Sequence, residues 1–269
     1  MFLDRLIGFL ELIRLIRLEY LEGMDNFPVD YYKHYLGGAV SGMFGILLSH
    51  PVDTIKTHLQ TGRPFRSFVF NITNLYKGLK APLLGVGVEK ALVFGTYNYC
   101  RTGLNWDIPI AGAMAGLIAS GIVSPYERWK ILRQTDAVME SRVIWNVGFL
   151  YRGFSATLTR EIPGFAIYFS IYESLKMKTE KMYDRRINYM ESFIYGGMSG
   201  CGAWIFIYPQ DRIKTILQSN SQGSISSIIG SIYKAGGLRH FYSGFSWAVA
   251  RALLLHSGTF CMMEVIQSF

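Results

Sequence analysis

The chain is short of charged residues and of long apolar runs. Only 17% of its 269 residues are Asp, Glu, Lys or Arg, and 50% are hydrophobic, whereas soluble domains carry about 25% charge. Few stretches reach about 18 uninterrupted apolar residues, because Gly, Pro and charged residues break them. This combination is typical of membrane helices that line a polar cavity, and it argues against a soluble globular domain.

Groups of residues that could carry out a reaction are also missing. The chain has 3 cysteines, Cys100, Cys201 and Cys261, at scattered positions, which favours buried thiols over a disulfide framework or a metal site. No nucleophile–base set, metal-spaced cluster or nucleotide-binding loop is visible. We therefore expect no catalytic residues, metal ion or cofactor. The net charge of +8 suits anionic lipids or solutes, but an ordinary excess of Lys and Arg in loops would give the same value.

One short motif is present three times. It consists of Pro, an acid two residues later, a base five later and Gln nine later, and it begins at Pro51, Pro125 and Pro209. A Gly pair precedes each copy and an aromatic-x-Gly corner follows it. The Gly pairs are Gly38/Gly42, Gly112/Gly116 and Gly196/Gly200, and the corners are Tyr76/Gly78, Tyr151/Gly153 and Tyr242/Gly244. Three copies in the same order indicate an internal repeat, and a repeat determines the fold.

Each repeat is predicted to form an apolar helix, a linker and a second apolar helix. Residues 38–60 would form a helix of about 34 Å, which is long enough to cross a bilayer. Gly pairs of this spacing let two membrane helices approach closely. The sequence therefore predicts an all-α membrane protein with repeats at 33–104, 105–182 and 183–269, each containing two transmembrane helices.

Residues 1–32 precede the first repeat. Residues 1–23 mix Leu and Ile with charges of both signs, a pattern that predicts an amphipathic helix on a membrane surface. This segment is too acidic for an ordinary transit peptide, and no cleavable secretory signal is evident. The alternative is that translation begins at Met24 and that the segment has no function.

Over about residues 33–269, the three motifs in register resemble the mitochondrial carrier family. The resemblance implies a six-helix pseudo-threefold barrel in the mitochondrial inner membrane, with short helices on the matrix side. It also implies a monomer that works by alternating access, with a small-molecule substrate and lipid as its partners and no nucleic acid.

The resemblance places the Pro motifs at a matrix gate. Pro kinks each helix, so that the lower halves bend toward a common axis, and each acid can meet the base of a neighbouring helix. In the family's order the pairs are Asp53–Lys130, Glu127–Lys214 and Asp211–Lys56, braced by Gln60, Gln134 and Gln218. The alternative is three intrahelical surface pairs, each worth only a few tenths of a kcal/mol.

The family has a second gate, at the cytoplasmic ends of the even-numbered helices, with the pattern aromatic-acid-x-x-base. The matching positions are Asn98/Arg101, Glu173/Lys176 and Glu264/Gln267, and only the middle copy is complete. Cyclic pairing then predicts the ionic pair Glu264–Arg101 and the polar contacts Asn98–Lys176 and Glu173–Gln267. Three ionic pairs at one gate against one at the other predict that the empty protein favours the form open to the cytoplasm.

The aromatic-x-Gly corners precede helix N-termini, where exposed N–H groups attract anions. The resemblance implies cardiolipin, as a structural lipid, at Gly78, Gly153 and Gly244. Ser243 departs from the basic residues of the other two corners. For any single corner, a Gly that merely ends a turn remains the alternative.

The family's spacing from the second gate gives the substrate contacts. They are Gly85, Glu89, Arg160, Glu161, Gly164 and Arg251. Two acids and two arginines within a bilayer are too costly for packing alone. An Arg can hold a carboxylate with two hydrogen bonds, and an acid can hold an ammonium group. The set is most similar to the basic amino-acid/ornithine and carnitine/acylcarnitine branch, and the stretch 160–163 is also similar to S-adenosylmethionine carriers.

Several alternatives remain open from the sequence. The chain could be a nucleotide or phosphate-ester carrier, although Glu89 and Glu161 would repel phosphate. It could also be a degenerate carrier-like protein that transports nothing. Glu89 could simply pair with the adjacent Lys90, and Val88, where the fourth helix has Pro163, puts the reach of Glu89 in question. We expect His256 to be a satisfied polar residue and not a proton relay.

Overall fold

The computed structural model describes residues 29–60, 75–76, 79–134, 151, 154–219 and 225–268. These residues form helices and turns without a β-strand, which confirms the all-α prediction. The helices are α2 (Val29–Gln60), α5 (Lys80–Asn98), α6 (Ile108–Gln134), α8 (Phe154–Tyr183), α9 (Tyr189–Ser219), α10 (Ile225–Phe241) and α11 (Phe245–Gln267), and a π-helical turn, η1 (Tyr99–Gly103), continues α5. The N-terminal segment 1–28 lies outside the described residues.

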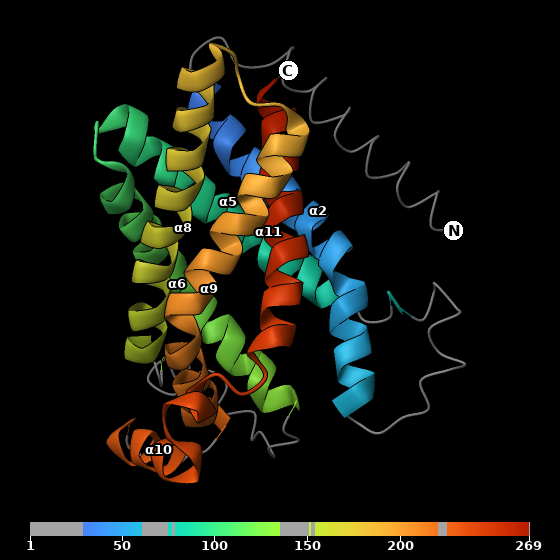
Figure 1. Cartoon of the computed structure of the whole chain (residues 1–269), viewed down its shortest axis with the longest axis vertical. Coiled ribbons are helices and arrows are strands. Elements are labelled where there is room, and N and C mark those ends of the chain that lie inside the picture. The colour runs from blue at the N-terminus through green and yellow to red at the C-terminus, as the bar shows by residue number, and fades with distance from the viewer. Residues whose placement is uncertain are drawn as a thin grey trace.

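Six long helices of the described residues form a closed ring. Around it, α2 packs on α5, α5 on α6, α6 on α8, α8 on α9, α9 on α11, and α11 returns to α2. In Figure 1, α2, α6 and α9 run from the end that holds the C-terminus to the end that holds α10, and α5, α8 and α11 run back. We call these the C-terminal end and the α10 end.

The predicted Gly pairs lie where the two helices of one repeat meet. A Cβ atom on Gly112 of α6 would be only 2.7 Å from the carbonyl oxygen of Phe165 on α8. A Cβ on Gly196 of α9 would be 2.6 Å from the carbonyl oxygen of His256 on α11. No side chain fits at such distances, so Gly is what allows these backbones to touch.

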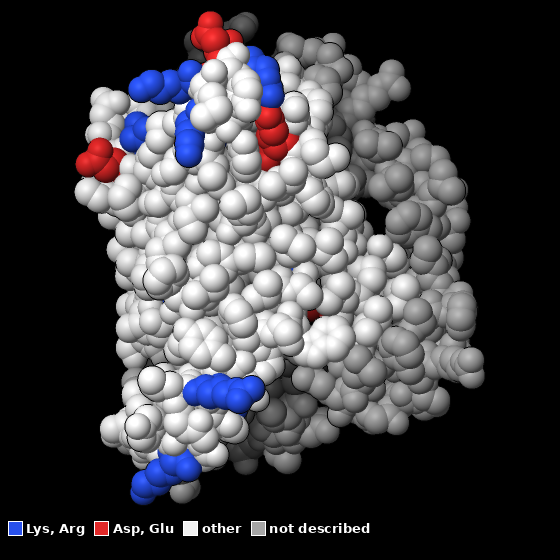
Figure 2. Space-filling model, in the orientation of Figure 1, with Lys and Arg blue, Asp and Glu red and all other residues white. Residues whose placement is uncertain are grey.

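Helix α6 buries small side chains and exposes large apolar ones. Ala111, Ala115 and Ala119 are fully buried, while Leu117 and Ile118 are exposed. Figure 2 shows the consequence for one face: charged side chains lie at both ends, with a nearly uncharged belt between them. An apolar exterior of this kind is what a bilayer requires.

Among the described helices, two stretches, Ile108–Tyr126 of α6 and Phe245–Gln267 of α11, are long and apolar enough by composition to cross a membrane. The other long helices carry more interruptions. In α8, for example, Arg160, Glu161, Pro163 and Glu173 interrupt the apolar sequence.

The three motif prolines lie inside helices: Pro51 in α2, Pro125 in α6 and Pro209 in α9. A helical Pro leaves the carbonyl four residues earlier without its donor. Two corner tyrosines supply that donor. The Tyr151 hydroxyl donates to the Gly121 carbonyl at 2.8 Å, and the Tyr242 hydroxyl donates to the Ile205 carbonyl at 3.0 Å. In the second and third repeats, a hydrogen bond thus links the corner tyrosine to the helix that the motif Pro interrupts.

The third corner shows why Gly is needed there. Gly244 has a φ of 83° directly before α11 begins, a left-handed conformation that favours Gly. The preceding Ser243 carbonyl accepts hydrogen bonds from Tyr208 and Arg212, at 2.7 and 2.8 Å. The other two corner glycines, Gly78 and Gly153, lie outside the described residues.

Candidate functional site

A cavity of about 460 Å³ lies between the helices. All six positions expected to contact a substrate line it: Gly85, Glu89, Arg160, Glu161, Gly164 and Arg251. Residues 85 and 89 lie on α5, residues 160, 161 and 164 on α8, and residue 251 on α11. The structure therefore brings together residues that are more than 150 positions apart in the chain.

Arg160 connects two carboxylates at this cavity. One of its terminal nitrogens donates to Asp211 Oδ1 at 2.7 Å, and the other contacts Glu161 Oε1. The Arg160 side chain is only 13% exposed and that of Glu161 9%. Asp211 belongs to the Pro motif of α9, so the arginine links the cavity to that motif.

Arg251 makes the corresponding link on the other side of the ring. Its Nε donates to Asp53 Oδ2 at 2.9 Å, which joins α11 to the Pro motif of α2. The sequence did not indicate either arginine-to-motif contact, because the family pattern assigns these acids to lysines. The approach of the motif acids to the cavity arginines is a property of the assembled ring.

Each of the three expected matrix-gate pairs includes a side chain outside the described part of the structure. Those side chains are Lys56, Gln60, Glu127, Lys130, Gln134 and Gln218. Among the described members, Lys214 is buried, with 2% exposure. The three pairs therefore stay predictions.

Glu89 pairs with its neighbour in the sequence. Lys90 Nζ lies 3.5 Å from Glu89 Oε1, and the Lys90 side chain is 2% exposed against 24% for Glu89. The Lys90 ammonium also lies over the Phe165 and Tyr168 rings, 4.7 and 5.4 Å from their centroids. The local pair that the sequence left open as an alternative is thus present, and Glu89 still lines the cavity.

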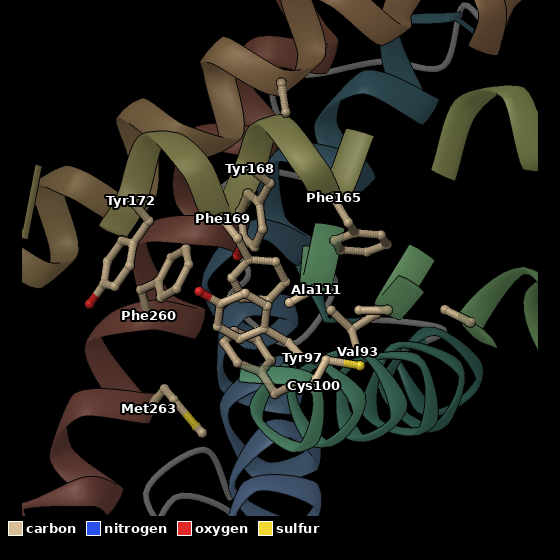
Figure 3. Close-up of a cluster of buried hydrophobic side chains, with 14 of the residues drawn as sticks. Val93, Tyr97, Cys100, Ala111, Phe165, Tyr168, Phe169, Tyr172, Phe260 and Met263 are labelled. Atoms are coloured by element: carbon tan, nitrogen blue, oxygen red, sulfur yellow. The ribbon is translucent and has the colours of Figure 1, made fainter. Parts of the chain in front are cut away.

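An aromatic layer separates this cavity from the C-terminal end. Phe94, Phe169 and Phe260, from α5, α8 and α11, contact one another with ring centroids 5.5 to 6.3 Å apart. Figure 3 shows Tyr97 face to face with Phe169 and Tyr172 beside Phe260, and these two pairs stack at 3.7 and 3.5 Å. The three returning helices therefore close on one another here.

In this structure the aromatic layer closes the end at which the cytoplasmic gate is expected. The ion-pair count omitted the burial and stacking of aromatic rings, which stabilise such contacts by more than their area alone. The preference of the empty protein for the form open to the cytoplasm stays a prediction.

The structure corrects the ionic pair expected at this gate. Glu264 Oε2 lies 3.2 Å from Lys176 Nζ, not beside Arg101, and Arg101 donates to the Trp106 carbonyl at 2.6 Å. Arg101 lies in η1, whose π-helical turn changes the direction of side chains that follow α5. Glu264 of α11 is therefore paired with a base of α8, the preceding returning helix.

Asn98 and Gln267 remain at the same end. Both line a second hollow together with Lys176 and Glu264. In the described part of the chain, neither makes the polar contact that the expected cyclic order assigned to it. For Asn98 the reason is that its expected partner, Lys176, pairs with Glu264.

The sequence motifs did not indicate two further residues of the cavity, Tyr126 and Trp204. A Cβ atom on Gly85 would lie 2.5 Å from the Tyr126 ring and hydroxyl, so Tyr126 of α6 fills the space that Gly85 leaves. Trp204 of α9 also lines the cavity. Tyr126 lies between the Pro and the acid of its motif, a position that the repeat pattern leaves unrestricted.

His256 is a satisfied polar residue, as expected. It is buried, and its Nδ1 lies 3.2 Å from the Tyr168 hydroxyl. The 3 cysteines are free thiols. The cavity wall thus combines three cationic side chains, two carboxylates and several aromatic rings, an arrangement able to hold groups of both signs.

Comparison with known proteins agrees with this architecture. The family model described as mitochondrial carrier protein matches residues 27–67, 104–183 and 185–269. The chain belongs to the mitochondrial carrier family. It is accordingly a multi-pass protein of the mitochondrial inner membrane, in a family of transporters.

Curated relatives align along most of this carrier. A mitochondrial basic amino acids transporter of Rattus norvegicus is 30% identical, covering 87% of this chain and 89% of that protein. A mitochondrial carnitine carrier of Saccharomyces cerevisiae is 29% identical, covering 88% and 87%. A mitochondrial arginine transporter of Arabidopsis thaliana is 27% identical, covering 82% and 88%.

Proposed function

We propose that this carrier exchanges a small metabolite that has both a carboxylate and a cationic group, such as a basic amino acid or carnitine. The observation that carries the proposal is the Asp211–Arg160–Glu161 cluster at the cavity wall. A lone arginine would suit an anion, and a lone acid would suit a cation. Together, at low exposure, they suit a solute with both charges.

The relatives support the same class. Their names refer to basic amino acids, carnitine and arginine, and each such solute contains a carboxylate and a cationic centre. A nucleotide or phosphate ester carries several negative charges, which Glu89 and Glu161 would repel.

The arginine contacts suggest how binding drives the cycle. A solute carboxylate that binds Arg160 or Arg251 competes with Asp211 or Asp53 for the same guanidinium. An acid released in this way becomes available to the lysines of the expected matrix gate. Solute binding would therefore favour closure at the α10 end while the aromatic layer opens, which is alternating access.

We also propose an oligomeric state and a bound lipid for this carrier. We take it to act as a monomer without a cofactor or catalytic residue. We also take cardiolipin to bind at the corners, including that of Gly244, where α11 presents its N-terminus.

Glu161→Gln tests the proposed solute class. The substitution keeps the shape and removes the charge, so exchange of cationic solutes is expected to fall about tenfold or more, while an anionic solute is affected less. Purified protein in liposomes, with labelled arginine and labelled malate compared in parallel, gives the readout. Asp184→Asn, in the exposed turn after α8, is the matched control, and an equal loss for both solutes in Glu161→Gln would contradict the proposal.

A further inference from the structure

Lys90 is a buried cation whose charged end lies in the cavity wall. Its side chain is 2% exposed, and it packs so closely on α2 that a Cβ on Gly42 would lie 2.6 Å from Lys90 Cγ. The stem is therefore held against α2, and Lys90 is one of the residues that line the cavity. A buried lysine within a membrane is costly, and packing alone does not require its charge.

Among the residues that the structure describes, the ammonium group has one carboxylate within ion-pair distance, Glu89. Their separation of 3.5 Å exceeds the 2.7–2.9 Å typical of a charge-assisted hydrogen bond, so the pair is loose. On the other side, the Phe165 and Tyr168 faces lie 4.7 and 5.4 Å from Lys90 Nζ. Aromatic faces at such distances attract a cation, so the two rings stabilise this ammonium group independently of Glu89.

The other charges facing the cavity are held differently. Arg160 and Arg251 each bind an acid from a Pro motif on another helix, whereas Glu89 and Lys90 are neighbours on α5. Glu89, at 24% exposure, is the more accessible member of its pair. A cation that enters the cavity can therefore reach Glu89 without breaking a contact between helices.

We propose that Lys90 is a tethered cation, a charge fixed to the wall of the site by its own side chain. Its ammonium group pairs with the Glu89 carboxylate while the cavity is empty and is displaced from that carboxylate by the cationic group of the solute. The inference rests on the proposed function, because it requires a solute with a cationic group. On displacement, the Lys90 ammonium keeps its contacts with the Phe165 and Tyr168 faces. Lys90 is thus a competitor built into the site, and it limits how tightly a cationic solute binds.

The Lys90–Glu89 pair also affects how the empty carrier changes its access. An unpaired Glu89 in an empty, low-dielectric cavity would be costly, and Lys90 neutralises it. With Lys90 in place, the empty carrier can change its access from one side to the other. Without it, that step needs a bound cation, so transport becomes more strictly dependent on exchange.

Lys90→Met tests the tether, because Met has a similar length and no charge. Purified protein in liposomes is assayed with labelled arginine, with and without unlabelled arginine inside. We expect the half-saturating concentration to fall about tenfold. We also expect the ratio of uptake into loaded liposomes to uptake into empty ones to rise, a readout that a merely structural role would not move. Lys181→Met, on the exposed end of α8, is the matched control and should change neither value.

Three results would overturn the tether. The half-saturating concentration could rise, which would show that Lys90 holds the solute carboxylate. Both readouts could remain at the natural values, which would show that Lys90 only packs. The double variant Glu89→Gln/Lys90→Met could bind as tightly as Lys90→Met, which would separate Lys90 from Glu89.

The liposome assay distinguishes failure of the Lys90 proposal from failure of the proposed function. If the natural protein exchanges no solute with a carboxylate and a cationic group, the proposed function is wrong. If it exchanges such a solute and Lys90→Met behaves like the natural protein, only the role proposed for Lys90 is wrong. Should Lys90→Met lose its thermal unfolding transition in detergent, Lys90→Gln replaces it, since its amide can still hydrogen-bond at the same site.

Discussion

Arg251 and Asp53 lie 198 residues apart in the chain and form an ion pair that joins the first and last repeats. The repeat pattern predicted both residues as functional, but for separate sites, because a linear motif cannot show which side chains a closed ring brings together. The same holds for Arg160 and Asp211. Residue identities in the cavity could be predicted from the sequence, whereas these cross-connections depend on three-dimensional placement.

Arg251→Gln and Asp53→Asn should not have additive effects. Both side chains are about one-third exposed, so solvent weakens the pair, and we expect a coupling of about 1 kcal/mol or less. Thermal unfolding of the two single variants and the double variant in detergent measures it. Additive shifts in the unfolding temperature would show that the contact contributes nothing to stability.

At the scale of helices, the repeat allowed most of the arrangement to be predicted. Each Gly pair marks a close helix contact, and each motif Pro lies within a helix. The order of pairing at the gate of α5, α8 and α11 was not predictable, because η1 turns Arg101 toward Trp106. A π-helical turn leaves no periodic signal in a sequence of five residues.

The Gly112 contact predicts a difference between two glycines of α6. Gly112→Ala would place a Cβ 2.7 Å from the Phe165 carbonyl oxygen, whereas a Cβ on Gly121 meets no atom within 4 Å. Separating α6 from α8 should cost about 1–3 kcal/mol, so Gly112→Ala should lower the unfolding temperature in detergent. Gly121→Ala is the control, and an equal effect of both would contradict the packing described here.

Tyr242→Phe removes the donor to the Ile205 carbonyl that Pro209 leaves without its helical partner. We expect a loss of about 1 kcal/mol, the usual contribution of such a hydrogen bond. Tyr233→Phe is the control, because Tyr233 is an exposed residue of α10. Thermal unfolding compares the two, and no difference between them would show that the carbonyl has another adequate donor.

At the scale of the whole molecule, two layers lie along the axis of the ring. The aromatic layer closes the C-terminal end, and the arginine–acid contacts connect the cavity with the Pro motifs. The chain's composition and repeats indicated a six-helix membrane protein, and the resemblance of its motifs to the family indicated a carrier, before any contact was known. They did not indicate the aromatic layer, because it depends on how apolar rings from three helices stack.

Phe94→Ala should loosen the aromatic layer, because Phe94 contacts both Phe169 and Phe260. Cys100 is a buried member of the same cluster, so its labelling by a water-soluble maleimide should accelerate severalfold. The comparison is made in a Cys201→Ser/Cys261→Ser background, with Phe206→Ala on the outer surface as the control. An unchanged labelling rate would show that the layer does not depend on Phe94.

The most direct test of the account is exchange by the purified protein in liposomes loaded with unlabelled solute. Labelled arginine, ornithine, carnitine, S-adenosylmethionine and ATP are compared. The account predicts exchange of one or more of the four solutes that carry both a carboxylate and a cation, and loss of that exchange in Arg160→Ala. Exchange of ATP alone would contradict the proposed solute class.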